Sequence, residues 1–530
     1  MRGVSLPVVV FTILIASFGL AQDKDQPLFR DHLGQVSFEI SCKPALQQQF
    51  DRGIALLHSF QYALAKSSFE IISQQDPDCA IAFWGEAMSL YHQIWHWPSY
   101  QDLKQGHGLL QHALQTRPKT TREQKYIQAL LSFYDARPGV TRLQRKEAYA
   151  KAMSRLYQKY PKDIDAAAFY ALSLLALGNE GNEPARTKAI GVLTQVFHAA
   201  PNHPGAAHYL IHATDTPVLA PKGLQAAQLY ATIAPSSAHA LHMPSHIFAQ
   251  LGLWPETIAS NLASAEAASN ATRNGVDNES GYQLHAMKYL EYAYLQIGND
   301  SAADRIVADV RDIPGIGSGD LVNDSSIMHA QYVMESHKWD SVDELVTQPA
   351  AVPFVKMRIL AARVIAQCRL RKVHEAETDM EELLQIPLQS YSQETTGRRP
   401  EIMEAEAWLA FVHGNDEEAE RQLTAAVAVD RFSVDESVLP ASELLGDLLL
   451  ELNKPGAALE AYADALKEAP NRFNSLYGAG QAAMRKGDHQ MAGRYFARLA
   501  AIADPASTRP EFHDAMAFLK SNRSSQGPAE

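Results

Sequence analysis

A recurrence of small and aromatic residues at a spacing of 34 constrains this chain more than any other feature. Near the C-terminus it is seen in three pairs: Gly446 and Gly480, Ala458 and Ala492, and Tyr462 and Phe496. The glycine lets two helices of a hairpin approach closely, the alanine fills their crossing, and the aromatic residue packs on the same helix face. A repeat of this length is one helical hairpin that buries its apolar face against the next copy. We therefore expect a stacked array.

The same pattern recurs near the N-terminus. Gly53, Ala65, Phe69 and Pro77 keep the intervals of the C-terminal copies, and the proline stops the second helix of the hairpin. These residues closely resemble the tetratricopeptide repeat family, which has an alanine, an aromatic residue four positions later and a terminal proline. The resemblance implies an all-α fold, a right-handed superhelical array of antiparallel helix hairpins.

Between the two ends the helix pairs follow a looser pattern. We predict an N-terminal array over residues 35–312, which holds a histidine-rich groove, and a C-terminal array over residues 320–506. The sequence leaves open whether the two arrays form one superhelix. The tail, residues 507–530, ends in serine, glycine and proline and is expected to be disordered.

Residues 1–21 have the features of a signal peptide. Arg2 gives a positive start, an apolar run extends from Val4 to Ile15, and small residues precede a cut after Ala21. The run is short for a membrane span, and no second apolar segment of spanning length follows. We expect a periplasmic or secreted protein with no membrane span after cleavage; an uncleaved N-terminal anchor is the competing interpretation.

The composition excludes two classes of protein. Hydrophobic residues make up 46% of the chain and charged residues 20%, which is typical of folded domains and not of disordered chains. The formal net charge of -13 repels polyanions, so we expect no nucleic-acid partner.

Export changes the interpretation of the cysteines. Cys42 precedes the first helix of one repeat and Cys79 precedes the first helix of the next, so a stacked array brings them close together. An oxidising compartment favours a disulfide between them, and the alternative is two small buried residues. Cys368 stands alone in a predicted helix and is expected in the core.

The most unusual feature is a set of histidines in the same 34-residue register. His208 and His242 are 34 residues apart, as are His212 and His246. Within each repeat the two are spaced i, i+4 and share one helical face, and the two helices are expected to lie side by side. Four imidazoles could then converge on zinc or copper, because the group contains no thiolate. Asp215 is expected to ligate the metal or to orient a ring.

The family frame adds further groove residues. In tetratricopeptide arrays, ligand contacts come mostly from the second, fifth, ninth, twelfth and thirteenth positions of the first helix. The resemblance therefore implies that these side chains line the groove: His58, Trp84, His92, His96, His239 and His285. His208 and His242 fall at the fifth position, His212 and His246 at the ninth, and His239 and His285 at the second.

Three interpretations of the histidines stay open. They are a metal site, a site for an organic ligand or for acid–base catalysis, and a structural network of polar side chains. Pro244 argues against a helical spacing of His242 and His246, because proline inside a helix forces a kink or a new start. The sequence has no phosphate-binding glycine loop, no G-x-S-x-G and no H-E-x-x-H, which favours a binding protein over an enzyme.

The histidine-rich segment also resembles motifs of exported bacterial tetratricopeptide proteins. The matching stretches are His-Pro-Gly-Ala-Ala-His-Tyr-Leu-Ile-His-Ala-Thr-Asp from His203 and His-Met-Pro-Ser-His-Ile-Phe from His242. This resemblance covers about residues 35–300 and implies a shared site without naming a reaction. We predict an exported binding or scaffold protein with a protein or peptide partner and a zinc or copper site. A metal-dependent hydrolase and a purely structural interaction array are the alternatives.

Overall fold

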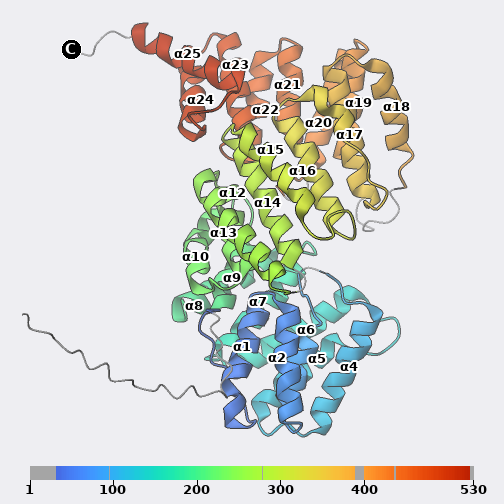
Figure 1. Cartoon of the computed structure of the whole chain (residues 1–530), viewed down its shortest axis with the longest axis vertical. Helices are drawn as coiled ribbons and strands as arrows, with labels where there is room; N and C mark the ends of the chain where they lie inside the picture. The colour runs from blue at the N-terminus through green and yellow to red at the C-terminus, as the bar shows by residue number, and fades with distance from the viewer. Residues whose placement is uncertain (1–31, 95, 277–278, 388–398, 435–436, 526–530) are drawn as a thin grey trace, which may run out of the picture.

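The chain folds as a continuous stack of antiparallel helix hairpins. The computed structural model describes residues 32–94, 96–276, 279–387, 399–434 and 437–525, and within them every regular element is a helix (Figure 1). The all-α array of hairpins predicted from the repeat is confirmed. The predicted signal peptide, residues 1–21, lies outside the described residues.

Each hairpin consists of a first and a second helix. The first helices are α1 (Gln47–His58), α3 (Ala80–Met88), α5 (Thr121–Phe133), α7 (Ile164–Gly178), α9 (Pro204–Thr214), α11 (Ala238–His242) with α12 (Pro244–Gln250), α14 (Glu279–Gln296), α16 (Leu321–Glu335), α17 (Pro353–Arg369), α19 (Pro400–Val412), α21 (Ala441–Glu451) and α23 (Phe473–Lys486). The second helices are α2 (Tyr62–Gln75), α4 (Tyr100–Gln115), α6 (Arg142–Lys159), α8 (Glu183–Ala199), α10 (Ala220–Ile233), α13 (Trp254–Arg273), α15 (Asp300–Asp309), the 3-10 helix η3 (Trp339–Glu344), α18 (Val373–Leu384), α20 (Asp416–Val429), α22 (Pro455–Glu468) and α24 (His489–Ile502). Two further 3-10 turns are η1 (Pro44–Leu46) and η2 (Val310–Asp312), and α25 (Pro510–Ser525) ends the array.

The close approach of the two helices in a hairpin depends on glycine, as the sequence predicts. A Cβ atom at Gly480 would lie 2.3 Å from the ring of Phe496, and one at Gly53 would lie 2.7 Å from the ring of Phe69. A side chain at either glycine would therefore push the aromatic ring out of the hairpin.

Most of the hairpins have a turn in which one residue is left-handed. Gly487 has φ 83° between α23 and α24, and Phe60 has φ 57° between α1 and α2. The amide that follows Phe60, that of Gln61, donates to the carbonyl of Leu56 at 2.9 Å, which closes the end of the first helix. A left-handed conformation is unfavourable for a bulky residue such as Phe60, so surrounding contacts must hold it there.

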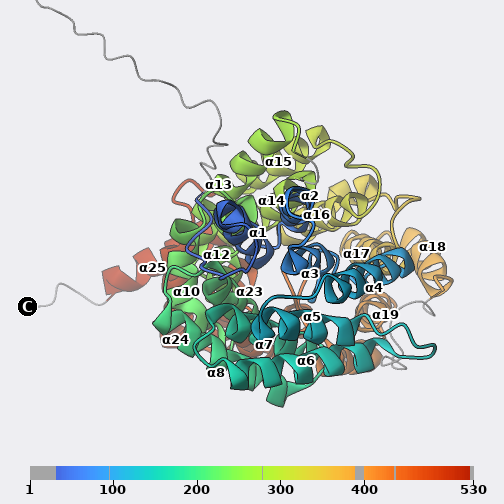
Figure 2. The ribbon, with the colours of Figure 1, turned by 90° about the horizontal axis from the view of Figure 1, so that it is seen from below.

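The predicted division between residues 312 and 320 does not interrupt the stack. Helix α14 packs on α16 as well as on α13 and α15. The C-terminal hairpins also contact α14 and α16. The buried Arg472 guanidinium bonds Tyr292 of α14, Glu335 of α16 and Glu443 of α21, each at 2.8 Å. The two predicted arrays are thus one superhelix, whose N-terminal helices curve around the long axis when seen from below (Figure 2).

The prediction of a disordered tail is wrong for residues 507–525. Helix α25 packs on α23 and α24 through Phe512 and Ala515, which are buried. Arg509, just before it, bonds Asp300 of α15 at 2.6 Å. The apolar spacing of Phe512 and Ala515 is helical, and this signal is stronger than the polar composition of the last few residues.

Cys42 and Cys79 form a disulfide in the structure, with Cα atoms 5.0 Å apart. It joins the segment before α1 to Cys79, the residue that immediately precedes α3. Cys368 is a free thiol buried in α17. Among the described residues, no helix combines the length and apolar character needed to cross a membrane.

Candidate metal centre

Six imidazoles gather where α9, α11, α12 and α14 pack together. They form two groups of three, within each of which the ligand nitrogens lie less than 4.8 Å from one another. The first triad is His208, His212 and His239. The second triad is His242, His246 and His285.

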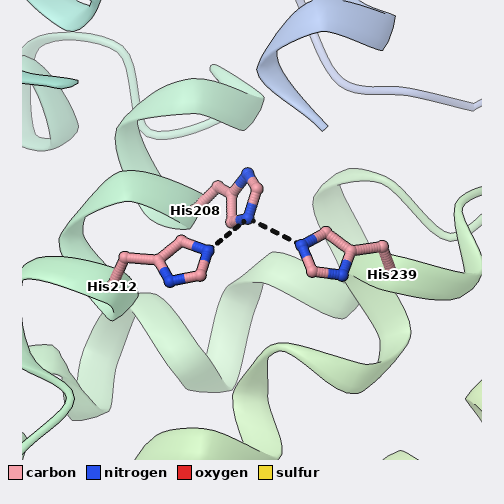
Figure 3. Close-up of side chains that lie close together, drawn as sticks. All are labelled: His208, His212 and His239. Carbon is pink, nitrogen blue, oxygen red and sulfur yellow. Dashed lines mark hydrogen bonds between the residues drawn. The ribbon is translucent and has the colours of Figure 1, made fainter. Parts of the chain in front are cut away.

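In the first triad, two rings point their Nε2 atoms at the Nε2 of His208 (Figure 3). The distance is 3.1 Å from His212 and 3.0 Å from His239. His208 and His212 lie one turn apart on α9, while His239 reaches across from α11 of the next repeat. Stacking of two neighbouring hairpins therefore brings three nitrogens to one point.

The second triad repeats this arrangement one hairpin further along. His242 and His246 face each other with their Nε2 atoms 3.0 Å apart, and the ring of His285 on α14 lies 4.4 Å from that of His242 between centroids. Pro244 does interrupt the helix, since α11 ends at His242 and α12 begins at Pro244. Met243, the residue between them, keeps helical dihedrals of -51° and -35°, so the two histidines stay on one face.

The grouping differs from the single four-histidine site expected from the sequence. The structure divides His208, His212, His242 and His246 into two pairs, and each pair gains a third ring from the following repeat, His239 or His285. In repeat numbering, each triad takes the fifth and ninth positions of one first helix and the second position of the next. The two residues assigned only to the groove thus complete the triads.

The partners of the Nδ1 atoms decide which nitrogen of each ring carries its hydrogen. Nδ1 of His208 lies 2.6 Å from the backbone carbonyl oxygen of His58, which can only accept. Nδ1 of His242 lies 2.6 Å from Oδ1 of Asn261, whose amide nitrogen already donates to the Thr257 carbonyl. Both rings therefore carry the hydrogen on Nδ1 when neutral, and their Nε2 atoms present a bare lone pair.

His246 is oriented by a carboxylate. Its Nδ1 lies 2.7 Å from Oδ2 of Asp215, while the Tyr289 hydroxyl lies further away, at 3.1 Å. The shorter, charge-assisted bond sets a hydrogen on Nδ1, so Nε2 of His246 presents its lone pair when the ring is neutral. Asp215 therefore holds a ligand ring, which is one of the two roles expected for it from the sequence.

Burial favours the neutral form of the three imidazoles of the first triad. It lowers the pKa of His208 to about 3, with a further contribution from the nearby rings of His58 and His246. Burial, followed by the effect of neighbouring imidazoles, also lowers the pKa of His212 and His239 well below its usual range. A neutral imidazole is the form that binds a metal ion.

Bare nitrogens that face one another are suited to a cation. In the second triad, the lone pairs of His242 and His246 meet at 3.0 Å, an arrangement that a metal ion between them would stabilise. Zinc bonded to imidazole at about 2.0–2.1 Å in tetrahedral geometry places its nitrogens about 3.3–3.4 Å apart. The rings need to open by only a few tenths of an ångström, and an all-imidazole set suits zinc or copper better than magnesium or calcium.

Aromatic rings enclose the two triads. Phe60 packs against the first triad, with its ring centroid 4.3 Å from that of His208 and 5.5 Å from that of His212. These contacts help to hold Phe60 in its left-handed conformation. His212 and His285, one ring from each triad, are only partly buried, so solvent reaches both triads at their edge.

A third group, which we call the aspartate network, consists of His58, Asp165 and His203. Oδ1 of Asp165 accepts from Nε2 of His58 at 3.0 Å and from Nε2 of His203 at 3.2 Å, and Nδ1 of His58 lies 2.9 Å from the Tyr209 hydroxyl. Burial alone would raise the pKa of Asp165, but the bonds from the two histidines outweigh it and hold the pKa well below its usual range. His58 is completely buried here, so its expected place in an open groove is wrong.

The remaining predicted groove residues lie apart from the triads. Trp84 is buried between Phe38 and Tyr126 and belongs to the core. His92 stacks on Tyr62 at 4.0 Å, and His96 is exposed. Sequence reasoning missed Asp165, His203 and Asn261. Asp165 contacts His58 and His203, which are distant from it in sequence, and Asn261 contacts His242 from the second helix of a hairpin.

Comparisons with known proteins agree on the repeat. The model of the tetratricopeptide repeat family matches residues 443–508, and no curated protein matches the sequence. A tetratricopeptide repeat protein from Parabacteroides merdae ATCC 43184 aligns at 15% identity and a TM-score of 0.31, over 54% of this chain and 98% of that one. The structure of Naa15/Naa10 bound to HypK-THB aligns at 13% identity and a TM-score of 0.27, over 91% of this chain and 97% of that one.

Those two alignments are too weak to carry an argument, so the assignment depends on the family match and on the hairpins. Gly53 and Phe69 near the N-terminus make the same close contact as Gly446 and Tyr462, which lie within the matched residues. Residues 443–508 are therefore tetratricopeptide repeats, and the hairpins before them have the same architecture.

Proposed function

We propose that the protein is an exported scaffold whose N-terminal half binds zinc or copper in the two histidine triads. The observation that carries the proposal is the convergence of three imidazoles in each triad, whose ligand nitrogens lie within 4.8 Å of one another. In the second triad, the Nε2 atoms of His242 and His246 face each other at 3.0 Å, and each ring has an acceptor at its Nδ1.

The scaffold part of the proposal follows from the fold. Tetratricopeptide repeats generally mediate contacts between proteins, and stacked hairpins present an extended surface for a partner. Metal bound between α9, α11, α12 and α14 joins three consecutive hairpins, so it would also fix the curvature of the surface that a protein or peptide partner meets. The fold alone does not distinguish this role from catalysis.

Export is supported by two independent features. Residues 1–21 have the composition of a signal peptide, and the chain carries the disulfide between Cys42 and Cys79. Disulfides persist mainly in oxidising compartments such as the periplasm or the extracellular space. We place the mature protein there.

Elemental analysis tests the metal site directly. The purified mature protein is dialysed against metal-free buffer, and zinc and copper are counted per chain in the wild type and in the double variant His208→Ala/His246→Ala. We expect metal in the wild type and a severalfold loss in the variant. The matched control is His92→Ala/His96→Ala, which removes two histidines outside the triads and should keep the metal. Equal metal in the wild type and the triad variant would contradict the proposal.

A further inference from the structure

We infer that the two triads form a single two-metal centre, in which adjacent ions share one small oxygen anion such as hydroxide or phosphate. The inference depends on the proposed metal binding and adds to it the number of ions, their coupling and the class of ligand between them.

The first argument is distance. The ring of His212 in the first triad lies 6.1 Å from that of His246 in the second, between centroids, and His239 lies 6.3 Å from His242. Within the first triad, the rings of His212 and His239 are also 6.3 Å apart. These two separations between the triads are similar to the longest separation within the first triad, so two ions held by the triads are near neighbours.

The second argument is a connection through Asp215. This residue ends helix α9, which carries His208 and His212 of the first triad. Its side chain, however, bonds His246 of the second triad at 2.7 Å and Gln250 of the same helix at 3.1 Å. A shift of α9 on binding one ion therefore moves the carboxylate that orients a ligand of the other.

The third argument is charge. Six neutral imidazoles contribute no negative charge, whereas two divalent ions bring four positive charges into a largely buried site. Asp215 offsets part of that charge through His246, and buried charge without compensation is costly. Three protein ligands also leave each zinc or copper ion at least one open coordination position. An anion that binds both ions offsets a further part of that charge and fills both positions.

The fourth argument is the size of the ligand. Tyr282 lies 5.4 Å from His239 and Tyr289 lies 5.0 Å from His242, between ring centroids, and Phe60 covers His208 on the other side. These rings leave the edge at the partly buried His212 and His285 as the way in. The surroundings therefore suit an anion of a few atoms.

The test uses copper, because two Cu(II) ions that share a ligand lose much of their paramagnetic signal. The full mature chain is stripped with a chelator, loaded with Cu(II), and examined by copper analysis and by quantitative electron paramagnetic resonance, with and without inorganic phosphate. We expect two copper ions per chain and a signal clearly weaker than that of two isolated ions. Phosphate should change the signal that remains.

Variants separate the two triads. His239→Ala should bind one copper ion per chain with the full signal of an isolated ion, and His285→Ala should do the same from the other side. His92→Ala should behave as the wild type. Circular dichroism shows whether each variant is folded. The copper count and the signal of the wild type test the inference even if a variant does not fold.

The outcomes distinguish the two proposals. One ion per chain in the wild type, or two ions with the full signal of two isolated spins, would overturn the shared centre and leave metal binding intact. No copper above the level of the double variant His208→Ala/His246→Ala would overturn both.

Discussion

Two kinds of histidine group lie next to each other in this array, and they differ in what each imidazole faces. In the aspartate network, His58 and His203 both donate to the carboxylate of Asp165. In the second triad, the bare nitrogens of His242 and His246 face each other. Both groups are buried, but the two histidines of the first share a carboxylate acceptor, whereas those of the second would gain from a cation. The burial and composition of the two groups are similar, so only the hydrogen-bond partners of each imidazole distinguish the aspartate network from the second triad.

The two kinds of group are also joined. The backbone carbonyl of His58, whose side chain belongs to the aspartate network, accepts the hydrogen bond from Nδ1 of His208 in the first triad. The network therefore supports the helix turn whose carbonyl fixes the tautomer of His208, a proposed metal ligand. We expect damage to the network to unfold the protein, and damage to the triads to remove metal while the fold survives.

The largest effect is expected from Asp165→Ala. It leaves two buried histidines without their acceptor, and the loss of one partner from a buried charged pair costs about 3–5 kcal/mol. Urea unfolding of the chelator-treated protein measures it. Asp165→Asn is the matched control: both histidines bond the same oxygen, Oδ1, which an amide retains, so it should cost less. An alanine variant as stable as the wild type would show that the network is dispensable.

Zinc should stabilise the wild type by about 2.7–4.1 kcal/mol when free zinc is 100 to 1,000 times the dissociation constant. The gain comes from binding to the folded state alone, since the triads need three neighbouring hairpins. Thermal or urea unfolding with zinc and with chelator measures the difference. Asp165→Asn should keep the gain, and His208→Ala/His246→Ala should lose it. A gain of equal size in the triad variant would place the bound zinc elsewhere.

The sequence predicted the array and half of the site for identifiable physical reasons. Gly53 and Phe69 report a contact inside one hairpin, so their spacing is visible along the chain. The i, i+4 spacing likewise placed His208 and His212 on one face. How neighbouring hairpins pack is not visible in this way, so His239 was assigned to the groove and not to the first triad.

A signal for the complete triads was nevertheless present. His239 and His285 fall at the same repeat position, and each lies beside the fifth and ninth positions of the preceding repeat once the hairpins are stacked. The interval between them is longer than 34 residues because α13, Trp254–Arg273, is a long second helix. Asp165 carried no such signal, since its role depends on α1, α7 and α9 meeting.

Acid should destabilise the protein through its buried histidines. The pKa of His58 is lowered to about 4, by burial, and that of His208 to about 3, whereas both rings in the unfolded chain titrate near about 6.5. Below about pH 6.5 the unfolded chain therefore binds protons that the folded chain does not, and stability falls as the pH falls. Above that pH both histidines are neutral in the folded and the unfolded chain, so they add no pH dependence to the free energy of unfolding.

Each of these histidines should cost about 1.4 kcal/mol per pH unit, or about 2 kcal/mol between pH 6.5 and pH 5. Urea unfolding of the chelator-treated protein at several pH values measures the slope. His208→Ala should lower the slope by up to about 1.4 kcal/mol per pH unit, which corresponds to one proton fewer bound on unfolding. The slope that remains then includes the contribution of His58 in the aspartate network. A free energy of unfolding that stays constant over this interval would contradict the assignment of neutral buried imidazoles.

The smallest effect expected is that of Asp215→Asn on the affinity for metal. This variant compares the two triads with each other, because Asp215 bonds a histidine of the second triad only. The amide oxygen can still accept one hydrogen bond, but the negative charge that orients and polarises His246 is lost. Loss of such a partner typically weakens metal binding 10- to 100-fold, or by about 1.4–2.7 kcal/mol. Titration of the stripped protein against a competing chelator measures both ions.

We expect the weakening to be larger for the ion in the second triad, because Asp215 bonds His246, while the first triad keeps His208 on its backbone carbonyl. Asp312→Asn, which removes an exposed carboxylate at η2, is the control for the change in net charge. If Asp215→Asn bound both ions as tightly as the wild type, the carboxylate would only pack against the ring.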